Sequence, residues 1–135
     1  MTVHFWLAAA AYVLPTFPLG YSWHLSTFKA QYDSLGLYRS DVIIPMGLAS
    51  MVLQGLIFAY LYPHLFSTAP ADWITSAMQF FLVFGGLAWS FIVLPVAAKY
   101  NMTSVSRFIA LETAFTVLQY AISAPLIALA WRDAA

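Results

Sequence analysis

The chain has no cysteine among its 135 residues, and only 7% of its residues are charged. Without cysteine it can form no disulfide, thiolate metal site or iron–sulfur cluster. The charged fraction is far below the roughly 25% that is typical of soluble domains. Five Lys and Arg residues balance five Asp and Glu residues, which leaves no basic surface for nucleic acid and no acidic tail for a cationic partner.

Hydrophobic residues make up 63% of the chain. They form four apolar runs of about twenty residues or more, the length that is needed to cross a lipid bilayer. The runs are Phe5–Phe28, Val42–Tyr62, Ile74–Ala98 and Phe108–Trp131. We therefore predict a single integral membrane domain over residues 1–135, built as an all-α bundle of four transmembrane helices. The first run is too long for the apolar region of a secretory signal, so we expect it to be retained as a span.

The connections between the runs are short, and their composition predicts how the helices begin. The segment Lys29–Asp41 is long enough for a short amphipathic piece. We expect Asp41 to cap the second helix, and either Ser104 or Ser106 to cap the fourth.

The positive charges predict an orientation in the membrane. Four of the five cationic residues lie in the segments Lys29–Asp41 and Lys99–Arg107, and only Arg132 lies on the opposite side. Because cytoplasmic loops carry an excess of Lys and Arg, we expect both segments in the cytoplasm and both termini outside.

Proline occurs inside the runs, beyond the first turn of each predicted helix, at Pro15, Pro18, Pro95 and Pro125. Each proline removes a backbone hydrogen bond and bends its helix, so we expect proline-kinked helices with room for a pocket between them. Aromatic residues make up 18% of the chain and could line such a pocket for a lipid, quinone, pigment, sterol or other hydrophobic ligand. Ordinary packing against lipid and neighbouring helices accounts for the same residues.

The second and fourth runs share a short sequence. Val52-Leu53-Gln54 matches Val117-Leu118-Gln119, whereas the first and third runs do not align convincingly. The match raises the possibility of two duplicated helical hairpins, with Gln54 and Gln119 at similar depth.

The only acidic residue inside the fourth run is Glu112, and it heads the series Glu112, Thr116, Gln119 and Ser123. The spacing places all four side chains on one helix face. An acid at the middle of a membrane helix costs roughly 2.5–3.5 kcal/mol, so this face should turn toward other helices. The residues expected to face lipid are Phe115, Leu118, Ile122 and Leu126.

A partner for Glu112 is expected on the first helix, where His24 lies at a similar distance from the same end. A pair of His and Glu could relay a proton, bind a metal together with further ligands, or tie two helices together. Glu112 could also pair with Arg107 or Lys99 near the membrane surface. With Gln54, Gln119, Thr116 and Ser123, these two residues form the candidate ligand-binding or proton site.

Small and polar residues on the third run predict a packing face. Ser76, Gln79, Val83, Gly86 and Ser90 repeat as in a coiled-coil seam.

No catalytic constellation is visible in the sequence. It has no phosphate-binding glycine loop, no GxSxG motif and no paired carboxylates on one membrane helix. His4 and His64 are weak candidates for a metal or haem ligand because they lack the HxxxH or HExxH spacing. The cofactor is left open.

Three short motifs resemble a known group of proteins. They are Gly20-Tyr21-Ser22-Trp23-His24, Tyr32 followed by Leu35-Gly36, and Ala98-Lys99-Tyr100-Asn101-Met102-Thr103. Together they are similar to small four-span bacterial inner-membrane proteins of unknown function. The resemblance implies four spans and a bacterial inner-membrane setting, and it implies no activity.

The sequence thus favours an integral membrane binding or accessory protein that holds a hydrophobic ligand or a partner subunit between its helices. The alternative is a small proton-coupled transporter or carrier that works as an oligomer, because four helices rarely enclose a substrate pathway. A membrane enzyme comes third.

Overall fold

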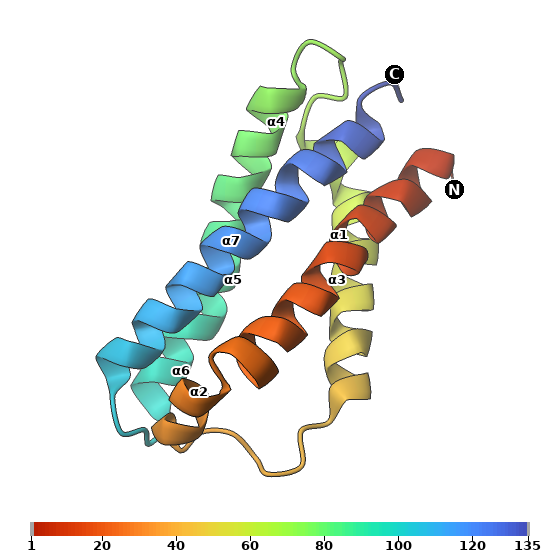
Figure 1. Cartoon of the computed structure of the whole chain (residues 1–135). Coiled ribbons are helices and arrows are strands. Elements are labelled where there is room, and N and C mark those ends of the chain that lie inside the picture. The colour runs from red at the N-terminus through yellow and green to blue at the C-terminus, as the bar shows by residue number, and fades with distance from the viewer. Residues whose placement is uncertain (1, 135) are drawn as a thin grey trace.

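The computed structural model describes residues 2–134, and 81% of the chain is helical. Four helical segments are long and apolar enough to cross a membrane: Val3–Thr27, Ile44–Leu65, Trp73–Lys99 and Val105–Trp131. They form an elongated bundle with both termini at the same end (Figure 1). The prediction of an all-α, four-helix integral membrane protein is confirmed, and every span begins and ends within three residues of its predicted limits.

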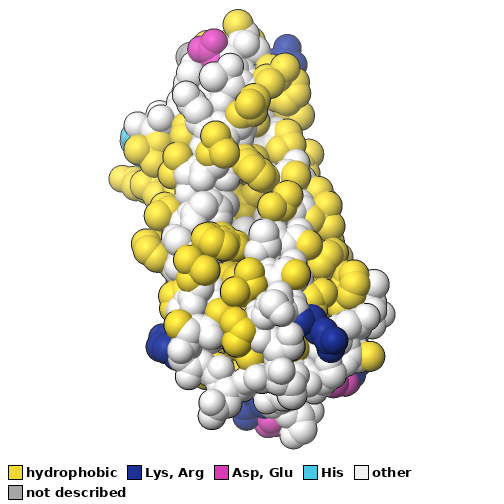
Figure 2. Space-filling model, turned by 90° about the vertical axis from the view of Figure 1, so that its left-hand side faces the viewer, with side chains coloured by type: hydrophobic (Ala, Val, Ile, Leu, Met, Phe, Trp, Pro, Cys, Tyr) yellow, Lys and Arg dark blue, Asp and Glu magenta, His cyan; other side chains and the backbone are white. Residues whose placement is uncertain are grey.

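The surface has the distribution that a membrane protein requires. On the face shown in Figure 2, hydrophobic side chains cover the middle of the molecule, and charged side chains lie toward its two ends. A bilayer would cover the apolar middle and leave the charged ends in water.

Two of the spans contain π-helical turns. The first span is α1 (Val3–Ser22) followed by η1 (Trp23–Thr27), and the second is α3 (Ile44–Leu65). The third consists of α4 (Trp73–Phe80), η2 (Phe81–Gly85), α5 (Gly86–Ala88), η3 (Trp89–Val93) and α6 (Leu94–Lys99). The fourth is the unbroken helix α7 (Val105–Trp131).

Helices α1 and α7 lie at the centre of the bundle, with α3 against α1 and the third span against α7. An aromatic core joins them in the half of the molecule that holds the termini. Phe58 of α3 contacts Tyr12 and Phe80, with ring centroids 4.9 and 5.2 Å apart. These three rings are at most 7% exposed. Their edge-to-face packing makes this half of the bundle dense.

The opposite half of the bundle opens between α1 and α3. The two backbones approach closely at Gly55, where an added Cβ would lie 3.0 Å from the Ala9 carbonyl oxygen. Toward its N-terminal end α3 diverges from the bundle (Figure 1), and residues 44–50 are all exposed. This divergence leaves space between the two helices.

The predicted amphipathic piece is present as the short helix α2 (Lys29–Leu35), which ends at Gly36 with a φ of 75°. Tyr32 and Leu35 are fully buried. The Thr103 backbone and hydroxyl donate to the carbonyl oxygens of Leu35 and Ser34, at 3.2 and 2.7 Å. These bonds hold α2 against the connection between the third and fourth spans.

The two predicted helix caps have different outcomes. The cap at Ser104 is confirmed, since its Oγ accepts from the Arg107 backbone N–H at 3.3 Å. The cap at Asp41 is wrong because α3 starts only at Ile44. The Asp41 carboxylate accepts two hydrogen bonds from the Arg39 guanidinium instead, at 2.9 and 3.0 Å.

The predicted packing face of the third span is also wrong. Ser76 is buried, but Gln79 and Val83 are exposed, whereas Phe80 and Val93 are buried. A π-helical turn holds more residues than an α-helical turn, so the face toward α7 drifts away from a heptad repeat.

The prolines do not interrupt the helices in which they lie. Pro15 and Pro18 are inside α1, and Pro125 is inside α7. Pro95 is in the first turn of α6, directly after the π-helical turn η3. The π-helical turn η3 therefore lies directly before Pro95, where the missing proline N–H would otherwise interrupt the α-helical hydrogen bonds.

Candidate functional site

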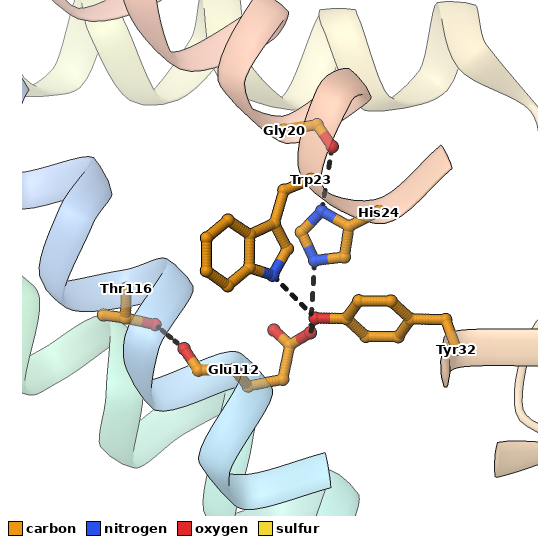
Figure 3. A network of polar contacts seen from close by, with 6 residues as sticks. All are labelled: Gly20, Trp23, His24, Tyr32, Glu112 and Thr116. Atoms are coloured by element: carbon orange, nitrogen blue, oxygen red, sulfur yellow. Dashed lines mark hydrogen bonds and ion pairs between the residues drawn. The ribbon is translucent and has the colours of Figure 1, made fainter. Parts of the chain in front are cut away.

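Glu112 lies inside the bundle and joins three segments of the chain. Its Oε1 accepts a hydrogen bond from the Tyr32 hydroxyl at 2.6 Å and lies 3.1 Å from Nε2 of His24 (Figure 3). Tyr32 comes from α2, His24 from η1 and Glu112 from α7. The side chains of His24 and Glu112 are only 19% and 13% exposed. We call these three residues the Glu112 cluster.

The contact of the other His24 nitrogen, Nδ1, determines how many protons His24 and Glu112 carry together. Nδ1 lies 2.9 Å from the Gly20 carbonyl oxygen. A carbonyl only accepts, so Nδ1 carries a proton. The contact between Nε2 and Glu112 Oε1 then needs one more proton, on either the imidazole or the carboxyl group. In both forms the pair is neutral overall, which avoids an isolated charge inside the membrane.

The backbone turn that carries His24 is itself unusual. His24 lies in the π-helical turn η1, which continues α1 at its end. The imidazole donates to the Gly20 carbonyl four residues earlier, where a regular α-helix would use its own backbone N–H. Single π-helical turns inside α-helices occur frequently at functional sites.

Tyr32 is held in place by aromatic neighbours. Trp23 Nε1 donates to the Tyr32 hydroxyl at 3.2 Å, and the Tyr32 ring stacks on the Tyr38 ring with centroids 5.0 Å apart. Burial raises the pKa of the Tyr32 phenol, and its hydrogen bond to Glu112 raises that pKa further. Burial also raises the pKa of Tyr38, with a smaller effect from the Glu112 charge. Tyr32 is therefore a protonated donor at neutral pH.

The two glutamines belong to a second network. The Tyr12 hydroxyl donates to Gln54 Oε1 at 2.5 Å and accepts from Gln119 Nε2 at 2.7 Å. Gln54 Nε2 in turn donates to Ser50 Oγ at 2.9 Å. Both amides reach one hydroxyl, so the similar depth predicted for Gln54 and Gln119 is confirmed. These matched donors and acceptors tie α1, α3 and α7 together.

The other two residues of the predicted stripe bind no other helix through their hydroxyls. Thr116 is 9% exposed, and its hydroxyl donates to the Glu112 backbone carbonyl at 2.7 Å. Ser123 is fully buried, and its hydroxyl has no hydrogen-bond partner among residues 2–134. All four residues of the stripe thus face inward or are shielded, but Glu112 and Gln119 belong to two separate networks and Ser123 to neither.

One of the residues predicted to face lipid does not. Phe115 is 9% exposed, and its ring lies against His24 with centroids 4.5 Å apart. Leu118 and Leu126 are exposed as predicted, and Ile122 is partly exposed. Phe115 differs because it follows Glu112 by three residues, so it lies on nearly the same side of α7.

A pocket of about 410 Å³ opens beside the Glu112 cluster. It lies between the end of α1, the turn η1, the segment 37–43 and the first turns of α3, where α3 diverges from the bundle. His24 and Phe115 form part of its wall, and Gly47 lines it from α3. A Cβ added at Gly47 would meet nothing within 4 Å. We call this space the inner pocket.

The remaining histidines lie away from this site. His4 Nδ1 donates to the Ala130 carbonyl oxygen at 2.9 Å, and its ring stacks on Trp131. His64 is exposed beside Tyr60. Among the described residues there is no group of three or more His, Cys, Asp or Glu side chains that could hold a metal ion.

The tyrosines of the two networks, Tyr12 and Tyr32, are not among the site residues predicted from the sequence. Tyr32 lies in a connecting segment, where an aromatic residue is ordinary at a membrane surface. Tyr12 was the more visible signal, because a phenol in the middle of an apolar span needs a hydrogen-bond partner. Arg39, at the edge of the inner pocket, was considered only for its charge.

Comparison of the chain with protein-family models, with curated proteins and with solved structures finds no match. The fold defines an integral membrane four-helix bundle, and its function has to be argued from the Glu112 cluster and the inner pocket.

Proposed function

We propose that this protein binds a hydrophobic ligand in the inner pocket, between the helices of the bundle. The observation that carries the proposal is the position of His24, which lines the pocket and also contacts Glu112. Ligand sites typically have volumes of about 300–1,000 Å³, apolar walls and a few polar groups that fix orientation. The inner pocket, at about 410 Å³, matches this description.

The proposed ligand has a polar end near the membrane surface and an apolar body within the membrane. Tyr38 and Arg39 lie on the connecting segment at one side of the pocket, while Phe17 and Met51 lie within the spans. The ligand would therefore be oriented as the surrounding lipids are. With the orientation that the cationic residues favour, the inner pocket opens on the cytoplasmic side of a bacterial inner membrane.

Filling the inner pocket tests the proposal. Gly47→Phe adds a phenyl ring at a residue that lines the pocket, without a steric clash at Cβ, because nothing lies within 4 Å of that position. Gly86→Phe is the matched control, since its Cβ also meets nothing within 4 Å and it lies in the third span. Both variants should insert and fold.

The readout is the hydrophobic molecule that remains bound after extraction in a mild detergent, identified by mass spectrometry. We expect the parent and Gly86→Phe to retain the same molecule and Gly47→Phe to lose it. Equal retention by all three proteins would refute binding in the inner pocket. A protein retained in place of a small molecule would favour a partner subunit.

A proton-coupled carrier that works as an oligomer is the second candidate. It is favoured by one observation, the 3.1 Å contact between His24 Nε2 and Glu112 Oε1 inside the spans. The two functions differ in sealed liposomes with an internal pH dye. A binding protein leaves the rate of proton entry at that of empty liposomes, whereas a carrier increases it in a way that Glu112→Gln abolishes.

A further inference from the structure

The wall of the inner pocket presents the nitrogen-bearing residue of each of two contacts with a carboxyl group. Arg39 lines the pocket, whereas Asp41, which accepts its two hydrogen bonds, does not. His24 lines the pocket, whereas Glu112, which it contacts, does not. None of the described residues that line the pocket is acidic. A ligand in the pocket would therefore meet the Arg39 guanidinium and the His24 imidazole but no carboxylate of the described residues.

The start of α3 contributes in the same direction. Ile44 and Gly47, in the first turns of this 22-residue helix, line the pocket. The N-terminal end of a helix carries a partial positive charge from its aligned peptide dipoles. No acidic residue lies in the first turn of α3 to compensate that charge. The Arg39 guanidinium, the His24 imidazole and a helix terminus thus line one space.

We propose that the ligand of the inner pocket is a single-chain amphiphile with an anionic head, of the class of a fatty-acid carboxylate. This inference rests on the function proposed above. The head would lie beside Arg39, where the pocket reaches the connecting segment, and the tail would lie between Phe17 and Met51 within the spans. A volume of about 410 Å³ is near the lower end of the range for ligand sites, which suits one chain rather than the two of a phospholipid.

Arg39 is available for such a head despite its ion pair. Its side chain is 60% exposed and that of Asp41 is 73% exposed, so solvent screens their attraction. Burial does not hold this pair together, and an incoming carboxylate can share the guanidinium through its remaining N–H groups. Asp41 then acts as a competitor for Arg39, which predicts opposite effects when either residue is neutralised.

The test compares three probes with the same tail: dodecanoate, dodecanol and dodecyltrimethylammonium. Each is titrated into the protein in nanodiscs of phosphatidylcholine, and the melting temperature reports binding because a ligand stabilises the state that binds it. We expect dodecanoate to act at about one tenth of the membrane concentration of dodecanol, a ratio that corresponds to about 1.4 kcal/mol.

Substitutions at Arg39 and Asp41 test the contribution of the anionic head separately from that of the tail. Arg39→Gln should abolish most of the advantage of dodecanoate over dodecanol, and Asp41→Asn should increase it severalfold. Arg132→Gln, at the other end of the bundle, is the matched control and should change nothing. If dodecanol or the ammonium probe stabilises the parent as well as dodecanoate does, the anionic head is wrong, although a hydrophobic ligand still fits the pocket.

Two further outcomes identify a different occupant. If phosphatidylglycerol in the nanodisc replaces dodecanoate in an Arg39-dependent way, the head belongs to a two-chain phospholipid and the single-chain inference is overturned. If no probe stabilises the parent, and Gly47→Phe retains the same molecules as the parent, the proposed function itself fails.

Discussion

At Glu112 one carboxylate oxygen contacts both a phenol and an imidazole, and this arrangement depends on a carboxyl group. Oε1 accepts from Tyr32 at 2.6 Å and lies 3.1 Å from His24 Nε2. A carboxylic acid can donate from an oxygen that also accepts, and a carboxylate can accept twice at the same oxygen. An amide separates these roles, because its oxygen only accepts and its nitrogen only donates.

Glu112→Gln should therefore destabilise the protein at neutral pH. With neutral His24, the amide can satisfy either Tyr32 or the imidazole from that position, and leaving a buried polar group unpaired costs roughly 1–3 kcal/mol. The measurement is the melting temperature of Glu112→Gln compared with that of the parent at neutral pH. We expect a lower value for the variant, and equal melting temperatures would contradict the two contacts at Oε1.

Tyr32 gives a second prediction, at alkaline pH. Its pKa is raised in the folded protein by burial and by Glu112, so above about pH 10 the unfolded chain loses this proton more readily than the folded one. Stability from Tyr32 is thus present below that pH and is lost as the pH rises. Tyr32→Phe should make the melting temperature fall less steeply above pH 10 than in the parent. The same slope in both proteins would show that the phenol is not buried as described.

The residues that the sequence identified at the site share one property, a polar group within an apolar span. Glu112 and His24 were found in this way because hydrocarbon cannot solvate them. Tyr32 was not found, since its contact with Glu112 joins residues 80 apart and no local pattern indicates it. The prediction that Phe115 faces lipid is wrong because a helix has more than one buried face, and the Phe115 ring packs against His24 beside Glu112.

Helices α1 and α3 are in close contact near the middle of α3 and lie apart near its N-terminal end. Contact is closest at Gly55, and the helices diverge toward Gly47, which borders the inner pocket. Both glycines lie in the same helix, so the space around each Cβ position decides what a substitution does. The pocket exists because α3 diverges from α1 between Gly55, where the two helices pack closely, and its own N-terminal end.

Alanine at these two glycines should have opposite effects. In Gly55→Ala the new Cβ lies 2.9 Å from Val13 Cγ2 and 3.0 Å from the Ala9 carbonyl oxygen, and such overpacking costs about 1–3 kcal/mol. In Gly47→Ala nothing is displaced, and the gain in helix propensity is roughly 0.5–1 kcal/mol. Thermal unfolding in one detergent measures both. A stabilised Gly55→Ala protein would show that the helices are not in contact there.

The limits of the spans were predictable because length and hydrophobicity alone decide which segments can cross a bilayer. Which side of each span faces the interior of the bundle was less predictable. In the third span, the turns Phe81–Gly85 and Trp89–Val93 are π-helical, and a heptad pattern assumes regular α-helix. The start of α3 was predicted at Asp41, but the Asp41 carboxylate accepts from Arg39 and does not cap the helix.

For the whole molecule, the cationic residues predict the orientation in the membrane. The segments 29–41 and 99–107 should be cytoplasmic and both termini outside. Because the chain has no cysteine, Ser34→Cys and Ser67→Cys report the two sides without background. An impermeant thiol reagent added to intact cells should label Ser67→Cys and spare Ser34→Cys. The reverse pattern would invert the orientation and move the inner pocket to the outer side.

The central claim, that the inner pocket holds the tail of an amphiphile, is tested most directly by nuclear Overhauser effects. The protein is placed in nanodiscs of perdeuterated lipid with protonated dodecanoate, and contacts are measured to assigned methyl groups. We predict strong effects at Leu25, Ile43 and Met51, which line the inner pocket, and their loss in Gly47→Phe. Effects confined to methyl groups elsewhere on the apolar surface, such as Ile92 and Leu129, would mean that dodecanoate occupies only the bilayer and would contradict the claim.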